Sequence, residues 1–157
     1  MRKVLANTTP LIALANIDRL ELLNKLYGTI IIPQAVMDEI IREPARQKVH
    51  DASWIKVEMI RDPSQKDIFR ARLHAGEVEL MILAREQKAD LVIMDDDAAK
   101  KTAKFLGLNV TGTLGVLLKA KREGLLEKVG PVMNELINDG LFISDTVKSY
   151  VLKEAGE

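Results

Sequence analysis

One short segment limits the possible folds of this chain more than any other. Leu91-Val92-Ile93-Met94 is apolar at every position and is followed at once by Asp95-Asp96-Asp97. A strand with one solvent-facing side alternates apolar and polar residues, whereas a strand that is apolar throughout is buried on both sides. Burial on both sides requires helices above and below the sheet, as in parallel α/β proteins. The segment therefore predicts a central, mostly parallel sheet.

The rest of the sequence supplies strands and helices in alternation, which predicts an α/β three-layer sandwich. Further strands are expected at 3–6, 29–32, 54–59 and 107–110, and the strand at 54–59 should lie at an edge because it alternates apolar and charged residues. Asp18 is a candidate cap where the first helical segment restarts, and polar residues dominate 42–53. Helical patterns occupy 11–26, 33–41, 62–74, 77–87, 98–106, 114–122, 129–137 and 145–154.

Length and composition are those of one domain with one core. The chain has 157 residues, of which 47% are hydrophobic and 29% charged, and this profile is typical of globular proteins. The absence of cysteine excludes disulfides and thiolate zinc sites, and the first twenty residues lack the apolar segment of a signal peptide. We therefore expect a single domain over residues 1–157, located in the cytoplasm without membrane attachment.

The charge balance gives the whole chain no attraction for polyanions. There are 23 basic and 23 acidic residues, so RNA would have to be bound by a local basic patch. The best candidates follow the aspartate run and a later Thr-Gly-Thr turn, and the alternative is an ordinary solvated helix face. These candidate RNA-binding residues are Lys100, Lys104, Lys119 and Lys121.

Polar residues stand where two of the predicted strands end. Asn7 follows the first strand and Asp95 follows the fully apolar one, and ligands of open parallel sheets bind beyond such carboxyl ends. Glu39 and Glu79, on helices, can aim at the same edge. Clustered carboxylates repel one another unless a cation neutralises them, and oxygen donors suit Mg²⁺ or Mn²⁺. Such an ion can activate water for phosphodiester hydrolysis.

Each acidic residue also has a purely structural interpretation. The aspartates at 95–97 can cap the following helix, Glu39 can be a solvated mid-helix residue, and glutamates at a helix start complement its dipole. Glu77 and Glu79 are two residues apart, which separates them by about 200° around a helix, so both cannot face one ion equally. Glu79 is preferred as the ligand because it begins the apolar run 80–83.

Five motifs stand in a fixed order along the chain. They are Ala6-Asn7-Thr8-Thr9-Pro10-Leu11-Ile12, Ile32-Pro33-Gln34-Ala35-Val36-Met37-Asp38-Glu39-Ile40, Gly76-Glu77-Val78-Glu79, Met94-Asp95-Asp96 and the segment 110–121. In their order and spacing they resemble the VapC-like PIN-domain proteins, and the first motif resembles the subgroup pattern (D/N)-(T/S)-(S/T)-P-L-I. The likeness extends over nearly the whole chain, with 42–69 least distinctive.

The resemblance implies a PIN-like fold with a Mg²⁺- or Mn²⁺-dependent endoribonuclease site. It also implies an RNA substrate, a homodimer, and a toxin that a small antitoxin protein neutralises. Most PIN nucleases have aspartate where this chain has Asn7, and an amide is a poorer ligand for a hard cation. The catalytic and metal-binding residues would be Asn7, Glu39, Glu79 and Asp95, with Asp96 as a further metal ligand and with Thr8 and Glu77 beside them.

Two other functional classes stay open. A phosphoacceptor receiver domain is also a small α/β protein with clustered aspartates, but it needs its acidic pair after the first strand, where this chain has Asn7. A PIN-like domain that binds RNA or protein without cleaving is the second alternative. His50 and His74 belong to no Ser-His-Asp arrangement and are interpreted as surface residues.

Overall fold

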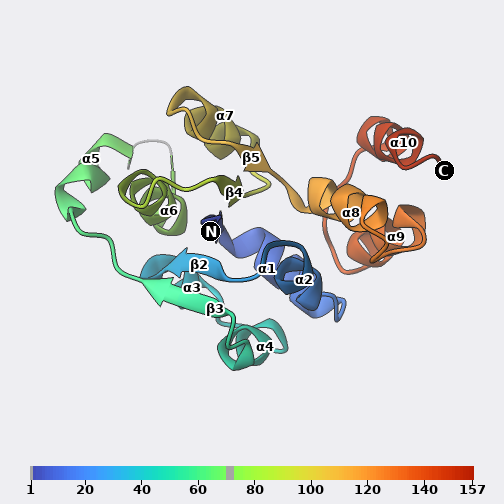
Figure 1. Ribbon diagram of the computed structural model, residues 1–157, viewed down its shortest axis with the longest axis horizontal. Coiled ribbons are helices and arrows are strands. Elements are labelled where there is room, and N and C mark those ends of the chain that lie inside the picture. Colours follow the sequence, from blue (N-terminus) through green and yellow to red (C-terminus); the bar gives the residue numbers. More distant parts are fainter. Residues whose placement is uncertain (1, 70–72) are drawn as a thin grey trace.

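The computed structural model describes residues 2–69 and 73–157, and their core is one parallel sheet (Figure 1). Within these residues five strands pair in the order β3-β2-β1-β4-β5, and every pair is parallel. The predicted α/β class is therefore confirmed. The strands are β1 (Val4–Ala6), β2 (Ile30–Pro33), β3 (Ile55–Glu58), β4 (Leu91–Ile93) and β5 (Val110–Thr111).

Both sides of the central strands are buried, as the fully apolar segment at 91–94 predicts. All three residues of β1 have no exposed surface, and they alternate between two cores. Val4 and Ala6 face one core and Leu5 faces the other. β3 lies at the edge, where Val57 is exposed, and this confirms the expectation from its alternating pattern.

Three helices contribute to the core that contains Leu5, Val92 and Met94. Their buried apolar side chains, such as Met81 and Ala99, pack on that face of the sheet. They are α5 (Lys66–Phe69), α6 (Ala75–Glu86) and α7 (Asp97–Phe105).

The opposite face is covered by a larger set of helices, which completes the three-layer sandwich. Figure 1 shows α8, α9 and α10 grouped together at one side of the molecule. A further short helix, α3 (Gln34–Glu39), follows β2 and packs beside α6. The helices of this layer are α1 (Thr8–Asn16), α2 (Glu21–Tyr27), α4 (Ala45–Asp51), α8 (Thr113–Arg122), α9 (Val129–Asn138) and α10 (Asp145–Glu154).

The helix expected at 62–74 is much shorter in the structure. A 3-10 turn, η1 (Pro63–Gln65), leads into α5, which is described only as far as Phe69, and residues 70–72 of the expected helix lie outside the described residues. Leu73 is not helical, and His74 has extended dihedrals, φ −81° and ψ 171°, because it is the N-cap of α6. α6 accordingly begins two residues before the expected start at Glu77.

Three smaller differences have local causes. The polar stretch 42–53 contains α4, which buries only Ala45 and Val49, so its apolar pattern is too sparse to indicate a helix. Asp18 lies in a left-handed turn with φ 59° and is not a cap, because α2 begins only at Glu21. The last strand is β5 and not 107–110, because Gly107 turns the chain with φ 81°.

A membrane-spanning helix would need greater length and more apolar residues than any helix within 2–69 and 73–157 possesses.

Candidate active site

The candidate site lies where the order of the strands reverses. From β1 the chain proceeds outward through β2 to β3, and it then crosses to the other side of β1 to form β4 and β5. Crevices at the carboxyl ends of such neighbouring strands are the usual ligand sites of open α/β sheets. Asn7 directly follows β1, where its N–H donates to the Ile93 carbonyl at 2.8 Å, and Asp95 follows β4. Both residues stand at the strand ends that their sequence positions predict.

Asn7 is almost fully buried and begins α1. Its side-chain oxygen accepts the Thr8 N–H at 2.9 Å, and only 3% of its surface is exposed. The Thr8 hydroxyl in turn donates to Glu39 Oε1 at 2.6 Å. Thr8 therefore links the end of β1 to the glutamate that sequence reasoning assigns to the same site.

Glu39 is the last residue of α3 and not a mid-helix residue, because this helix has only six residues. Its Oε2 accepts the Gly76 N–H at 2.8 Å, and His74 Nδ1 lies 3.5 Å from the same oxygen. A Cβ on Gly76 would lie 2.3 Å from Glu39 Oε1, so glycine is required for this approach. Glu39 thus joins the end of α3 to the start of α6.

Glu77 is a buried carboxylate among other acidic groups. Its side chain is 4% exposed, and Oε2 lies 3.2 Å from His74 Nε2. Burial raises the pKa of Glu77, and the neighbouring charges of Asp96 and Glu39 raise it further, whereas His74 and its hydrogen bond lower it. Glu77 therefore belongs electrostatically to the same group as Glu39 and Asp96.

Glu79 is engaged elsewhere. Its Oε1 accepts the Ala35 N–H at 3.0 Å at the start of α3, and its Oε2 pairs with Lys66 Nζ at 3.2 Å. The two glutamates of α6 point in different directions, as their spacing of two residues requires. The structure thus brings Glu77 to Glu39 and Asp96, whereas the sequence-based preference was for Glu79.

The three aspartates after β4 have different contacts. Asp95 Oδ1 accepts the Thr113 N–H at 2.8 Å, and Oδ2 accepts the Thr113 hydroxyl at 2.6 Å. Asp96 is the N-cap of α7 and accepts the Ala99 N–H at 2.9 Å, so the capping interpretation holds for this residue. Asp97 is the first helical residue.

Each of the four carboxylates proposed as ligands accepts a hydrogen bond from a backbone N–H in the first turn of a helix. The pairs are Glu39 with α6, Glu79 with α3, Asp95 with α8 and Asp96 with α7. The positive ends of helix dipoles favour such negative groups. In the part of the chain that the structure describes, no three Asp, Glu or His side chains are grouped closely enough to hold an ion.

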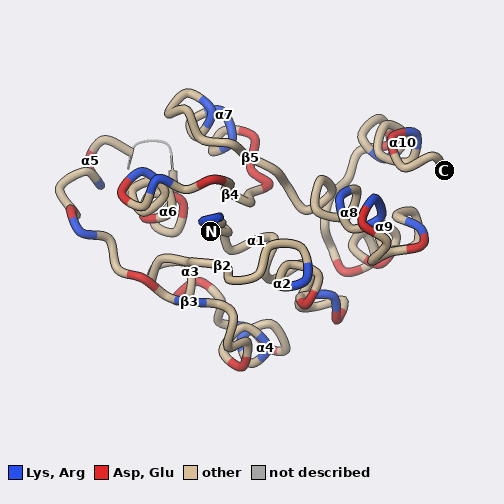
Figure 2. Tube along the Cα trace, in the orientation of Figure 1, with Lys and Arg blue, Asp and Glu red and all other residues tan. Residues whose placement is uncertain are grey.

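Lys100 and Lys104 both lie on α7, but they differ in their position relative to Asp95. Lys100 lies near Asp95, since a Cβ on Gly112 would be 2.9 Å from Lys100 Nζ and 2.7 Å from Asp95 Oδ1. Lys104 stands one turn further along α7, about 6 Å away along its axis. Figure 2 shows the acidic residues before α7 leading into its basic residues. Only Lys100 of these two lines a cavity with Asp95.

The other two lysines make contacts within their own helical layer. Lys119 lies over the Tyr27 ring at 4.8 Å and pairs with Glu123 at 3.8 Å. Lys121 donates to the Ala155 carbonyl at 2.5 Å and to Glu157 at 2.9 Å. Both ammonium groups therefore already have partners within the protein.

The sequence reasoning did not assign His74 and Thr113 to the candidate site. His74 is a surface residue, as interpreted from the sequence, with 59% of its side chain exposed, but it also contacts both Glu39 and Glu77, and its place just before Gly76-Glu77 was the available signal. Thr113 is fully buried and holds Asp95, and its place directly after the last strand, in the Thr-Gly-Thr turn, could have indicated this.

Comparison with known families agrees with this arrangement. The family model described as DUF3368, a PIN domain, matches residues 3–157, which is nearly the whole chain. No curated protein sequence matches the chain significantly. A five-stranded parallel sheet flanked by helices, with polar residues at the carboxyl ends of β1 and β4, is consistent with the PIN fold. The chain therefore belongs to the PIN-domain family.

Proposed function

We propose that this protein is a PIN-type endoribonuclease that hydrolyses phosphodiester bonds of single-stranded RNA with Mg²⁺ or Mn²⁺. PIN domains are generally nucleases. The observation that carries the proposal is the position of Asn7 and Asp95 at the adjacent carboxyl ends of β1 and β4, where the strand order reverses. Glu39 and Glu77 flank this position from α3 and α6.

The chemistry of the donors suits a hard divalent cation, and in the described residues they would have to move closer together to hold it. Oxygen donors come from Asn7, Glu39, Glu77, Asp95 and Asp96, and Mg²⁺ and Mn²⁺ prefer such ligands. Burial and the charges of Asp96 and Glu39 raise the pKa of Glu77, and this like-charge crowding is what a bound cation would relieve. When bound, the ion would supply an activated water and would stabilise charge on the phosphate. Glu79 is left out of this set because Lys66 already neutralises it.

The chain's own residues prepare this site. Thr113 and Thr8 orient Asp95 and Glu39 through their hydroxyls, and the Gly76 N–H holds the second oxygen of Glu39. A pre-oriented set of donors lowers the cost of assembling the reactive arrangement.

The physiological role that we propose is that of a toxin controlled by a small antitoxin protein, acting as a homodimer. Tyr150 leaves 61% of its surface exposed on α10, outside the cavity beside Asp95, which supports contact of that helix with a second copy. Light scattering of the purified protein tests the dimer, and growth arrest on expression, absent for Asp95→Asn, tests the toxin role. A monomer in solution would remove the dimer from the proposal.

A second candidate is a PIN domain that binds RNA or a partner protein without cleavage. Two observations favour it. An amide, Asn7, stands where most PIN nucleases have aspartate, and among the described residues no three Asp, Glu or His side chains are close enough to hold an ion. A metal-dependent turnover assay separates the two functions.

The deciding experiment follows cleavage of a labelled single-stranded RNA with Mn²⁺, with Mg²⁺ and with EDTA. The nuclease requires cleavage that EDTA abolishes, that Asp95→Asn removes and that Asp97→Asn largely keeps, because Asp97 belongs to the first turn of α7. Binding of RNA without turnover under all three conditions would establish the second candidate. Cleavage that persists in EDTA with folded, nuclease-free protein would overturn the metal mechanism.

A further inference from the structure

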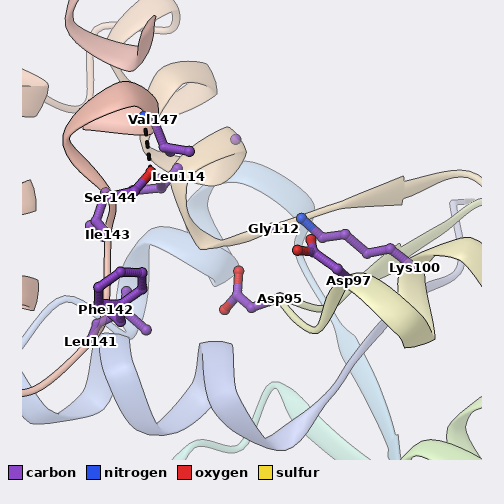
Figure 3. A pocket seen from close by; sticks show the side chains of 11 residues that line it. Asp95, Asp97, Lys100, Gly112, Leu114, Leu141, Phe142, Ile143, Ser144 and Val147 are labelled. Atoms are coloured by element: carbon purple, nitrogen blue, oxygen red, sulfur yellow. Dashed lines mark hydrogen bonds between the residues drawn. The ribbon is translucent and has the colours of Figure 1, made fainter. Parts of the chain in front are cut away.

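A cavity of about 370 Å³ opens directly beside Asp95. This volume is within the range of about 300–1,000 Å³ that is usual for small-molecule sites. The cavity lies between α7, the start of α8 and the segment 141–147, which connects α9 to α10 and begins the latter (Figure 3). It therefore continues the candidate active site on the β5 side of the sheet.

The two ends of the cavity differ in chemistry. Asp95, Asp97 and Lys100 line one end, and Figure 3 shows Asp95 between the Lys100 side and the Phe142 side. The other end is mostly apolar, and the Ser144 hydroxyl there already accepts the Val147 N–H. The apolar lining consists of Leu114, Leu141, Phe142, Ile143 and Val147.

Phe142 is the most unusual residue of this wall. It leaves 89% of its surface exposed although it is a large aromatic side chain. An exposed ring beside a polar site offers a flat face on which a nucleobase can stack, with a contribution of about 1–3 kcal/mol per base. The irregular segment that carries it is held by Ser144, the N-cap of α10.

Lys100 provides a cation at the opposite end. Its ammonium approaches Asp95 and Gly112, and it forms no hydrogen bond or ion pair with other described residues. A lysine that forms no direct ion pair can bind a phosphate and release counterions. An aromatic end and a cationic end suit the two parts of a nucleotide, its base and its phosphate.

We propose that this cavity binds one unpaired nucleotide of the substrate strand, with its base on Phe142 and its phosphate near Lys100. The proposal rests on the proposed ribonuclease function and adds the place where one nucleotide of the substrate strand binds. Stacking needs a base that is free of a duplex, and the apolar wall provides few hydrogen-bond groups to read its identity. The subsite therefore selects single-stranded RNA and tolerates any base.

The test measures binding, independently of cleavage. Fluorescence anisotropy in EDTA follows a labelled single-stranded RNA made only of uridines, and a second RNA made only of adenosines. Phe142→Ala should weaken binding of both by about tenfold or more, and Phe142→Tyr should restore it. Phe105→Ala is the matched control, because Phe105 is 90% exposed but lies at the last residue of α7 outside this cavity.

Lys100 gives a second, independent readout. Lys100→Gln should reduce the slope of log affinity against log salt by about 0.7, the value for one phosphate contact on a single strand. Lys25→Gln, on an exposed lysine in the last turn of α2 and outside the cavity, should leave the slope unchanged.

The outcomes separate this proposal from the function on which it rests. If the parent protein cleaves RNA with Mn²⁺ but Phe142→Ala binds RNA like Phe105→Ala, the subsite is overturned and the nuclease stands. That result would leave the apolar wall to a protein partner. If the parent neither cleaves nor binds RNA, both proposals are overturned.

Discussion

Thr113 holds Asp95 with two hydrogen bonds, one from its backbone N–H at 2.8 Å and one from its hydroxyl at 2.6 Å. The two residues follow neighbouring strands, β4 and β5, so this contact joins the carboxyl ends of those strands. Both oxygens of Asp95 receive a donor from Thr113, and Thr113 itself is fully buried. The orientation of Asp95 is therefore set by a residue that bears no charge.

Removing the hydroxyl should loosen Asp95 without altering charge. Thr113→Val keeps the size and the backbone N–H, and we expect it to cost about 0.5–1.5 kcal/mol of unfolding free energy. Mn²⁺-dependent cleavage should fall by up to about tenfold, because Asp95 is no longer fixed at both oxygens. Urea unfolding and a cleavage assay check these values, with Thr113→Ser as the variant that retains the hydroxyl. Equal activity of the valine and serine variants would show that the hydroxyl does not position Asp95.

The two glutamates of α6 should respond in opposite ways to amide substitution. Burial raises the pKa of Glu77, so its charged form is unfavourable in the folded protein, and Glu77→Gln should raise the free energy of unfolding in EDTA or leave it the same. Cleavage by the same variant should fall by about tenfold or more. Glu79→Gln loses the pair with Lys66 and should cost less than about 1 kcal/mol, with cleavage kept. If Glu79→Gln is instead the inactive variant, Glu79 is the ligand.

Glu157 should make stability depend on pH in the acidic range. Backbone hydrogen bonds from Val129 and Gly130, at 2.7 and 2.9 Å, together with Lys121, hold its pKa at about 2, below the usual 4.5. A carboxylate with a depressed pKa stabilises the fold above its unfolded-state pKa, and this contribution is lost as pH falls from about 4.5 towards about 2. Because 13% of the Glu157 side chain is still exposed, salt should screen part of the effect.

Thermal melts across this pH range test the role of Glu157. Glu157→Gln should melt at a lower temperature than the parent at neutral pH, and the difference should shrink as the pH falls. Glu154→Gln, an exposed glutamate at the end of α10, is the control that should follow the parent at every pH. A constant difference for Glu157→Gln would mean that its carboxylate charge is not what stabilises α9.

The parallel sheet was predictable because its strands differ sharply in composition from their surroundings. A segment without any polar residue, such as 91–94, can satisfy its apolar side chains only between two layers. Elements whose stability depends on few apolar contacts were not predictable in the same way. α4 buries Ala45 and Val49 alone, and its helical form depends on packing against α1.

The places of the candidate site residues were predictable at strand ends and not on helices. Strand direction alone places Asn7 and Asp95 at one edge, because carboxyl ends of parallel strands meet there. The direction of a helical side chain depends on where its helix begins and on partners distant in sequence. α6 begins at Ala75, and Glu79 pairs with Lys66, so the sequence alone could not show that Glu77, and not Glu79, is the neighbour of Glu39 and Asp96.

Asn7 is the position at which one substitution is expected to strengthen binding of the metal ion. Asn7→Asp keeps an oxygen that can accept the Thr8 N–H, so α1 should still begin there. The added negative charge is almost fully buried beside other acidic groups and should lower the melting temperature in EDTA. A divalent ion should reverse this loss, because a carboxylate is a better ligand than an amide.

The expected gain is a lower Mn²⁺ concentration for half-maximal cleavage, by about tenfold if the new contact contributes about 1.4 kcal/mol. Melting curves with and without Mn²⁺ give a second measure that does not depend on activity. Asn134→Asp adds the same charge on the exposed side of α9 and should show neither the loss in EDTA nor the recovery with Mn²⁺. If Asn7→Asp and Asn134→Asp respond alike to Mn²⁺, then Asn7 does not contact the ion, and the domain that binds without cleaving becomes the better description.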